Sequence, residues 1–219
     1  NEQAAAGLVI RMLEEGKQVA LITDAGTPAV SDPGARAVAR VQDAGFPVVP
    51  VPGASAVITA LSASGLADGH FHFHGFLPTK SAARRASLES LRSVPGTLVF
   101  YEAPHRIAET LDDLAAVFEP VRELVVAREL TKMFEQIVRM PITEGPAWLA
   151  ADPNRARGEF VLLVSAAPVA EGLSPEAERV LGLLLAELPV KQAAKLAAAI
   201  TGESKNALYE RALAMRDEG

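Results

Sequence analysis

The stretch KQVALITDAGTPAVSDPGAR, residues 17–36, places a short apolar run directly before a loop rich in Gly, Pro, Asp, Ser and Thr. An apolar run of this length is typical of a strand buried on both faces. The loop contains two turn sequences, because Gly supplies positive φ, Pro fixes φ, and Asp or Ser caps the next amide. A simple crossover needs only about two to six residues. We therefore expect the loop at residues 24–36 to be a ligand loop as well as a turn.

The same pattern of strand, loop and helix occurs twice at the start of the chain. A helix is expected over residues 34–44, and a second apolar run at 46–51 enters PGAS and a small-residue helix at 54–64. This alternation predicts an open, mainly parallel α/β sheet, whose ligands sit beyond the carboxyl ends of the strands. The G-x-G-x-x-G and G-x-x-x-x-G-K-[ST] fingerprints are absent, so a dinucleotide or a triphosphate is not the first expectation.

The middle of the chain changes character at HFHFHG, residues 70–75. Its strict alternation indicates a half-exposed strand. The three His side chains on one side suggest a metal site, but the run has no Cys or carboxylate, and the polar face of an edge strand explains it better. Further strands are expected at 97–101, 123–127, 134–139 and 156–164, with a hairpin between the second and third of these. An amphipathic helix is expected at 107–118.

The last part of the chain is helical in pattern. Residues 167–175 read as a linker, and Ser174 followed by Pro175 predicts the start of a helix. Helices are expected at 176–188, 190–200 and 204–215, and the short turn TGES between the last two matches a helix-turn-helix unit. Ala-rich helical hairpins are also common structural devices, so the pattern alone leaves nucleic-acid contact open. We divide the chain into residues 1–69, 70–167 and 174–219.

Composition limits the classes of function. About half of the 219 residues are apolar, there is no Cys, and the formal net charge is −6. No window approaches the roughly 20 apolar residues of a membrane span, and the first residues lack the basic-then-apolar order of a signal peptide, so we expect a cytoplasmic protein without membrane contact. An acidic protein can bind nucleic acid only through a local basic patch.

Seven ordered motifs resemble one known family. They are LITDAGTPAVSDPG, VPVPGASAVITALSASGL, FHGFLPTK, TLVFYEAPHRIAETL, VVARELTKMFE, RGEFVLLV and the closing PVKQAAKLAAAITGESKNALYERAL. The succession resembles the tetrapyrrole-methylase-like family of S-adenosylmethionine-dependent methyltransferases, and within it the bacterial enzymes that methylate a cytidine 2'-hydroxyl of 16S ribosomal RNA. The resemblance implies two α/β domains with the cofactor between them and a small helix-turn-helix-like domain. It also implies a homodimer, the 30S subunit as partner, and an opening strand with a loop similar to TPIGNL, which is missing before Asn1.

The resemblance further implies a set of residues that bind S-adenosylmethionine. They are Asp24, Ala25, Gly26, Thr27, Ser55, Ala56, Tyr101, Glu102, Ala127, Arg128, Gly158 and Glu159.

Catalysis and RNA binding need further groups. A ribose 2'-hydroxyl is a poor nucleophile at neutral pH and benefits from a general base or a nearby cation, for which Glu102, Glu129 and Lys132 are candidates at strand ends. Each of them also fits a structural ion pair, and His105 is a weaker candidate that instead caps the following helix. No metal is required. We expect an RNA-binding positive face formed by Lys80, Arg84, Arg85, Arg106, Arg128, Lys132, Lys191, Lys195 and Lys205.

Two other functions stay open at this point. The same fold would serve a methylase of a tetrapyrrole or another small molecule, although YEAPHR, RELTK and the helical tail count against it. A non-catalytic RNA-binding protein with remnant loops is the third possibility.

Overall fold

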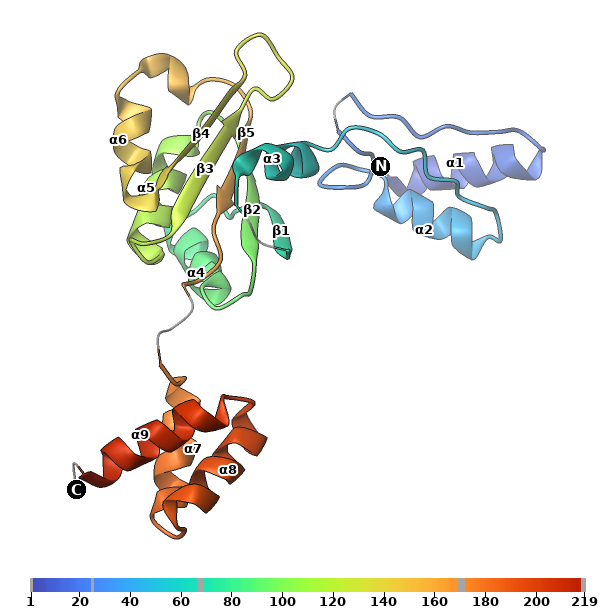
Figure 1. The fold of residues 1–219 in the computed structure, drawn as a ribbon. Helices are drawn as coiled ribbons and strands as arrows, with labels where there is room; N and C mark the ends of the chain where they lie inside the picture. Colours follow the sequence, from blue (N-terminus) through green and yellow to red (C-terminus); the bar gives the residue numbers. More distant parts are fainter. Residues whose placement is uncertain (1, 25, 67–68, 169–171, 218–219) are drawn as a thin grey trace. The chain divides into compact units, whose positions relative to one another are not determined.

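The computed structural model describes residues 2–24, 26–66, 69–168 and 172–217. The chain forms two compact units, residues 1–167 and 168–219 (Figure 1). The expected linker at 167–175 spans this division, although residues 169–171 lie outside the described residues. The finer boundary between residues 69 and 70 stays a prediction.

The first unit contains a five-stranded sheet in the order β1-β2-β5-β3-β4 (Figure 1). The strands are β1 Phe71–Phe76, β2 Thr97–Glu102, β3 Glu123–Arg128, β4 Gln136–Pro141 and β5 Phe160–Val164. Strands β1 and β2 run parallel because helix α4, Ser81–Leu91, crosses between them. Strands β3 and β4 form the expected hairpin, and β5 pairs antiparallel with both β2 and β3. The sheet is therefore mixed, and the expected strand positions in this region are confirmed.

Helices cover both faces of this sheet (Figure 1). One face packs against α4, α5 (Ile107–Val117) and α6 (Gly145–Ala150), through strand residues such as Leu98, Phe100 and Leu162. The other face packs against α3, Ala56–Ser64, through Val99, Val125 and Val161. Neighbouring strand residues belong to opposite clusters because side chains alternate along a strand. Two short 3-10 helices, Ile142–Glu144 and Pro153–Ala156, flank α6.

The first 66 residues contain helices without the two strands expected from the sequence. Helices α1, Glu2–Glu14, and α2, Ala35–Asp43, pack against each other, and α2 and α3 confirm two expected helices. Residues 17–23 and 46–51 form no ladder among the described residues, so the expectation of strands there is wrong. Ile22 is 85% exposed and Val51 is 86% exposed. Apolar runs become strands only where a neighbouring strand binds their backbone groups, and none of the described strands does so here.

The second unit is a three-helix domain with its own core. Helices α7, Pro175–Leu185, α8, Val190–Thr201, and α9, Lys205–Asp217, surround small buried side chains such as Ala193, Ala197 and Leu208. The Ser174 hydroxyl accepts a hydrogen bond from the Ala177 N–H at 3.2 Å, and Pro175 begins α7 as expected. Gly202 ends α8 with φ of 75°, a left-handed conformation that Gly adopts without strain. The three expected helices are confirmed.

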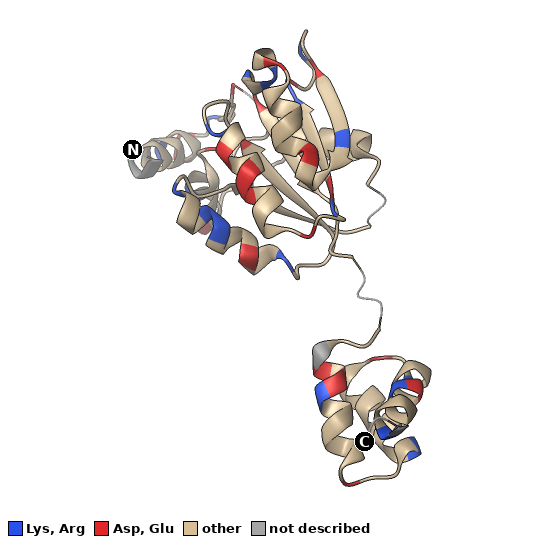
Figure 2. Cartoon of the chain, turned by 90° about the vertical axis from the view of Figure 1, so that its left-hand side faces the viewer, with Lys and Arg blue, Asp and Glu red and all other residues tan. Residues whose placement is uncertain are grey.

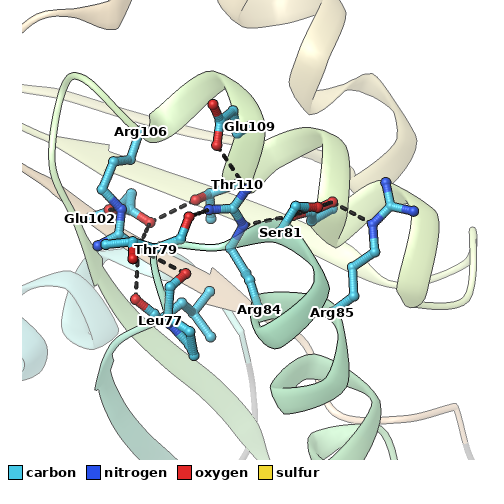
Figure 3. A network of polar contacts seen from close by, with 11 residues as sticks. Leu77, Thr79, Ser81, Arg84, Arg85, Glu102, Arg106, Glu109 and Thr110 are labelled. Atoms are coloured by element: carbon cyan, nitrogen blue, oxygen red, sulfur yellow. Dashed lines mark hydrogen bonds and ion pairs between the residues drawn. The ribbon is translucent and has the colours of Figure 1, made fainter.

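A buried ion pair joins α4 to α5 on the face of the sheet that these two helices cover (Figure 3). The Arg84 Nε donates to Asp113 Oδ2 at 2.6 Å, and both side chains are almost fully buried. Arg85 donates to the other carboxylate oxygen at 2.5 Å, and Ser81 donates to both at 3.1 Å. Burial alone would raise the pKa of Asp113, but the hydrogen bonds from Arg85, Arg84 and Ser81 outweigh it and lower that pKa.

Among the residues with a described position, no helix has both the length and the hydropathy needed to cross a membrane.

Replacement of Asp113 tests the importance of this pair. Asp113→Ala leaves the buried Arg84 charge without its main partner, so we expect the free energy of unfolding to fall by about 3–5 kcal/mol. Trp148, the single tryptophan, lies in α6 of the first unit, so its fluorescence in a urea titration reports on this unit. Asp112→Ala, at the exposed neighbouring position, is the matched control and should change stability by less than about 0.5 kcal/mol.

The pH dependence follows from the lowered pKa of Asp113. The stabilisation from the pair is present above the ordinary carboxyl pKa of about 3.9 and is lost as the pH falls through the lower pKa of the folded state. The difference between wild type and Asp113→Ala should therefore shrink in acid. Equal stability of the two proteins at neutral pH would contradict the assigned role.

Candidate functional site

The loop at residues 24–36 is folded tightly. Gly26 and Gly34 have φ of 67° and 134°, and two residues with side chains, Ala29 and Ser31, also have positive φ, at 67° and 54°. A positive φ at a residue other than glycine costs free energy, and such residues cluster at functional sites. A Cβ at Gly75 in β1 would lie 3.1 Å from the Ser31 Oγ, so the second half of the loop lies against the edge of the sheet. The turn chemistry expected from the sequence is present.

A hydrogen bond links this loop to the PGAS loop. The Thr27 Oγ1 donates to the Ala54 carbonyl at 3.0 Å. Two stretches that the sequence marks separately as ligand loops are thus held side by side. Ala25 lies outside the described residues, whereas Asp24, Gly26 and Thr27 are all exposed. A Cβ at Gly26 would meet nothing within 4 Å, so backbone is open to a ligand here.

The PGAS loop leads into α3, whose first turn reaches Tyr101 at the end of β2. The Val57 N–H donates a hydrogen bond to the Tyr101 hydroxyl oxygen. Burial raises the pKa of Tyr101 by more than this hydrogen bond lowers it. Ser55 occupies the N-cap position of α3. Ala56, Tyr101 and Ala127 belong to one apolar cluster on this face of the sheet. The structure therefore brings together predicted cofactor residues from four separate segments of the chain.

The ends of β3 and β5 carry a second group of predicted residues. The Lys132 Nζ donates to Glu129 Oε1 at 3.0 Å and to Glu159 Oε2 at 2.8 Å, while the Glu159 N–H donates to Glu129 Oε1 at 2.9 Å. These hydrogen bonds from Glu159 and Lys132 lower the pKa of Glu129. The hydrogen bonds that Lys132 donates to Glu159 and Glu129 raise the pKa of Lys132. Both side chains therefore stay charged through the neutral range, and Lys132 acts there as a cation.

Gly158 is required beside this group. Its φ is 94°, and a Cβ would lie 2.4 Å from the Glu129 Cγ. The Glu129 side chain thus packs over bare backbone. Arg128 completes this strand end by donating to the carbonyls of Arg157 at 3.2 Å, of Phe134 at 3.4 Å and of Asn154. Its Nε is buried and has no hydrogen-bond partner among the described residues.

Glu102 occupies a different environment from Glu129 (Figure 3). Its side chain is fully buried and accepts hydrogen bonds from the Thr110 hydroxyl at 2.6 Å and the Ala103 N–H at 2.8 Å. The Arg106 Nε lies 3.2 Å from Oε1 without hydrogen-bond alignment, and this contact is therefore an ion pair. These contacts favour the structural alternative, and we withdraw Glu102 as a candidate base. His105 is exposed, and Arg106 rather than His105 occupies the N-cap position of α5.

The predicted RNA-binding face divides into accessible and inaccessible residues. Arg84 is fully buried, so the prediction that it contacts RNA is wrong. Arg106 also has its partners within the protein and not in RNA, because it donates to the Leu77 carbonyl at 2.6 Å and pairs with Glu102. Figure 2 shows the basic segment of α4 beside acidic segments of α5, in agreement with the ion pairs between them. The exposed members of the set are Lys80, Arg85, Lys132, Lys191, Lys195 and Lys205.

The sequence reasoning missed the partners of Arg84 and Glu102. Asp113 binds Arg84 and Thr110 binds Glu102, and both partners lie on α5. Their signal is weak, since a polar residue on the buried face of an amphipathic helix is visible only as a break in its pattern.

The His run forms strand β1 at the edge of the sheet, as expected. His74 lies 3.4 Å from the Ser87 Oγ, and burial together with the nearby His72 lowers the pKa of His74. Within the described ranges, no group of three or more His, Asp or Glu side chains is arranged to hold a metal ion.

Substitutions at Thr27 test whether the link between the two loops forms a cofactor site. Thr27→Val removes the hydrogen bond to Ala54, which is worth about 0.5–1.5 kcal/mol, so the Kd for S-adenosylmethionine should rise about 2- to 10-fold. Thr27→Ser keeps the hydroxyl and should bind like wild type. Isothermal titration calorimetry on the three proteins measures the effect. Equal affinity of the Val and Ser variants would show that the link does not support binding.

Curated relatives resemble the chain along nearly its full length. It is 52% identical to "Ribosomal RNA small subunit methyltransferase I" of Pseudomonas aeruginosa, over 97% of this chain and 77% of the relative. It is 49% identical to the protein of the same name from Escherichia coli O157:H7, over 97% of this chain and 75% of the relative.

Solved structures show the same fold at lower identity. The methyltransferase CobJ matches with a TM-score of 0.57 and 22% identity, over 80% of this chain and 75% of CobJ. Uroporphyrin-III C-methyl transferase from Thermus thermophilus, complexed with S-adenosyl homocysteine, matches with a TM-score of 0.51 and 19% identity, over 75% of this chain and 74% of that chain.

Family models match both units of the chain. Residues 171–216 match the RsmI C-terminal HTH domain. Residues 1–145 match the Tetrapyrrole (Corrin/Porphyrin) Methylases, which agrees with the motifs, the sheet and the relatives. The chain belongs to the tetrapyrrole (corrin/porphyrin) methylase family.

Proposed function

We propose that the protein is an S-adenosylmethionine-dependent methyltransferase that modifies the 2'-hydroxyl of a cytidine in 16S ribosomal RNA of the small subunit. The observation that carries this proposal is the identity of about half of all residues to ribosomal RNA small subunit methyltransferases over nearly the whole chain. Family membership supports the methyltransferase activity and the cofactor. The match of the helical unit to the RsmI C-terminal HTH domain supports RNA as substrate.

The group around the first turn of α3 fits the cofactor chemically. An adenosine needs an apolar surface, which the partly exposed Ala56 and Tyr101 provide, whereas Ala127 is fully buried in the same cluster. The ribose and amino-acid parts need polar partners, for which Asp24 and the open backbone at Gly26 are suited. Of the remaining predicted residues, we also assign S-adenosylmethionine binding to Thr27, Ser55, Arg128, Gly158 and Glu159. Ala25 lies outside the described residues. Glu102 is fully buried and already bound to Thr110 and Arg106, so we do not assign it to the cofactor.

When bound, S-adenosylmethionine supplies an activated methyl group, so the protein mainly has to position the acceptor. Positioning can contribute about 7–11 kcal/mol to lowering the barrier. Lys132 is the cation among the three catalytic candidates, and two carboxylates hold it while its side chain stays 47% exposed. Leu130, two residues before it, packs against the apolar cluster of α3. We assign to Lys132 the stabilisation of negative charge on the ribose oxygen. Glu129 then acts through Lys132 as a positioning residue.

RNA contact is assigned to exposed cations on both units. Lys80 lies at the start of α4, and Lys191, Lys195 and Lys205 lie on α8 and α9, the helix pair of the helix-turn-helix match. Phosphate contacts by such residues position a protein on RNA. A homodimer, which the family resemblance supports, and a cytoplasmic location complete the proposal.

Methyl transfer to ribosomal subunits tests the function. With tritiated S-adenosylmethionine, we expect label in the RNA of 30S subunits lacking this methyl group and none in 50S subunits, the matched control. Digestion of the labelled RNA should release 2'-O-methylcytidine. Transfer to a porphyrinogen with none to ribosomal RNA would contradict the proposal and favour a tetrapyrrole methylase. Binding of RNA without any transfer would favour the non-catalytic alternative.

Replacement of Lys132 tests the cationic role. Lys132→Met should lower kcat by about 10²–10³, the range for loss of one group that stabilises a developing oxyanion. Lys132→Arg keeps the charge and should retain more activity, and both variants should bind S-adenosylmethionine like wild type. Because the pKa of Lys132 is raised, wild-type kcat should show no titration of this residue between about pH 6 and 9. A Met variant with wild-type kcat would rule out the role.

A further inference from the structure

The loop between β3 and β4, residues 129–135, extends beyond the ends of these strands (Figure 1). It presents two large apolar side chains to solvent. Met133 is 91% exposed and Phe134 is 67% exposed. Leu130, in the same loop, packs against the apolar cluster beneath α3. The loop is therefore anchored on its inner side, while its tip carries an exposed aromatic ring.

Hydrogen bonds hold this loop in one shape. The Thr131 N–H donates to Glu135 Oε2 at 2.5 Å, and the Lys132 and Glu135 N–H groups donate to the Glu129 and Lys132 carbonyls at 3.0 and 3.1 Å. Glu129 and Thr131 have φ of 50° and 64°. A surface that is already ordered loses little conformational entropy when it binds a partner, so the loop is suited to recognition.

Arg128 joins the tip of this loop to the backbone of Arg157. One guanidinium donates to the Phe134 carbonyl at 3.4 Å and to the Arg157 carbonyl at 3.2 Å. The Arg157 side chain is exposed and has neither an ion pair nor a hydrogen bond to any other described residue. The nearby carboxylates of Glu129 and Glu159 are already paired with Lys132. An exposed ring and an available guanidinium thus lie on segments held by the same side chain.

We propose that Phe134 stacks on an unpaired base of the RNA substrate and that Arg157 binds a neighbouring phosphate. Proteins hold single-stranded RNA by this combination, since every base has a face for an aromatic ring and every nucleotide carries a negative charge. The position supports RNA as the occupant, because the loop itself contains Lys132, the cation assigned to the acceptor ribose. Arg128 is the positioning residue for both contacts. The inference rests on the proposed function. It adds a further RNA contact to those assigned to Lys80, Lys191, Lys195 and Lys205.

Substitutions at Phe134 test the stacking. Phe134→Ala should raise the Kd for 30S subunits, and the KM in methyl transfer, about 5- to 150-fold, because loss of one stacked base has that effect. Phe134→Trp should bind like wild type, whereas Phe134→Leu, which is apolar without a ring, should resemble Ala. Phe71→Ala removes another exposed ring, at the start of β1, and is the matched control with no expected change. The Kd for S-adenosylmethionine should be the same in all of them.

A charge substitution tests the phosphate contact. Arg157→Gln should weaken binding to 30S subunits. It should also reduce the slope of log Kd against log salt concentration by the amount that corresponds to the loss of about one phosphate contact. Arg157→Lys should keep most of the salt dependence.

The outcomes separate this inference from the function beneath it. If wild type and Phe134→Ala methylate 30S subunits equally well, the inference is overturned and the proposed function stands. A Leu variant equal to wild type would replace stacking by simple apolar contact and also overturn it. A Phe134→Ala variant that changes only the sedimentation coefficient would make the tip a contact between copies of the chain. Wild type that neither binds nor methylates the subunits would overturn the proposed function together with the inference.

Discussion

The packing of α3 on the sheet is the contact on which the candidate site depends. Val57 and Ala60 bury against Val99, Val125 and Val161, and this apolar contact fixes where the first turn of the helix lies. The PGAS loop is thereby set at the end of β2, where Tyr101 receives the N–H of Val57. Thr27 then ties the first ligand loop to Ala54. Separate loops come together in one candidate site because one small-residue helix can approach the sheet closely.

Arginine has an unexpected structural role in this fold. Arg84, Arg106 and Arg128 each donate to backbone carbonyls of irregular segments, where no strand or helix satisfies those groups. Buried carboxylates pair with the first two, Asp113 with Arg84 and Glu102 with Arg106. Guanidinium suits this work because its planar set of donors can serve several oxygens at once. The cations that look like an RNA-binding set in the sequence therefore partly serve to shape loops.

The sequence predicted most of the fold because hydrophobic periodicity is local. The strands from β1 to β5 and the terminal helices follow from alternation and from end signals such as Ser174 and Pro175. Residues 17–23 and 46–51 show the limit of this reasoning, since apolar composition does not reveal whether a pairing neighbour exists. The site was predictable by motif for Thr27 and Tyr101. The burial of Arg84 was not, because its partner Asp113 is close only after α4 and α5 have packed. Phe134 and Arg157 carry no motif, and only the hydrogen bonds of Arg128 bring them together.

A crystal structure with S-adenosylhomocysteine bound tests the central claim most directly, because it shows which face of the sheet holds the cofactor. The account predicts a ligand beside the first turn of α3, in contact with the backbone at Gly26 and with Ala56 and Tyr101. A ligand bound on the opposite face, among α4, α5 and α6, would contradict it.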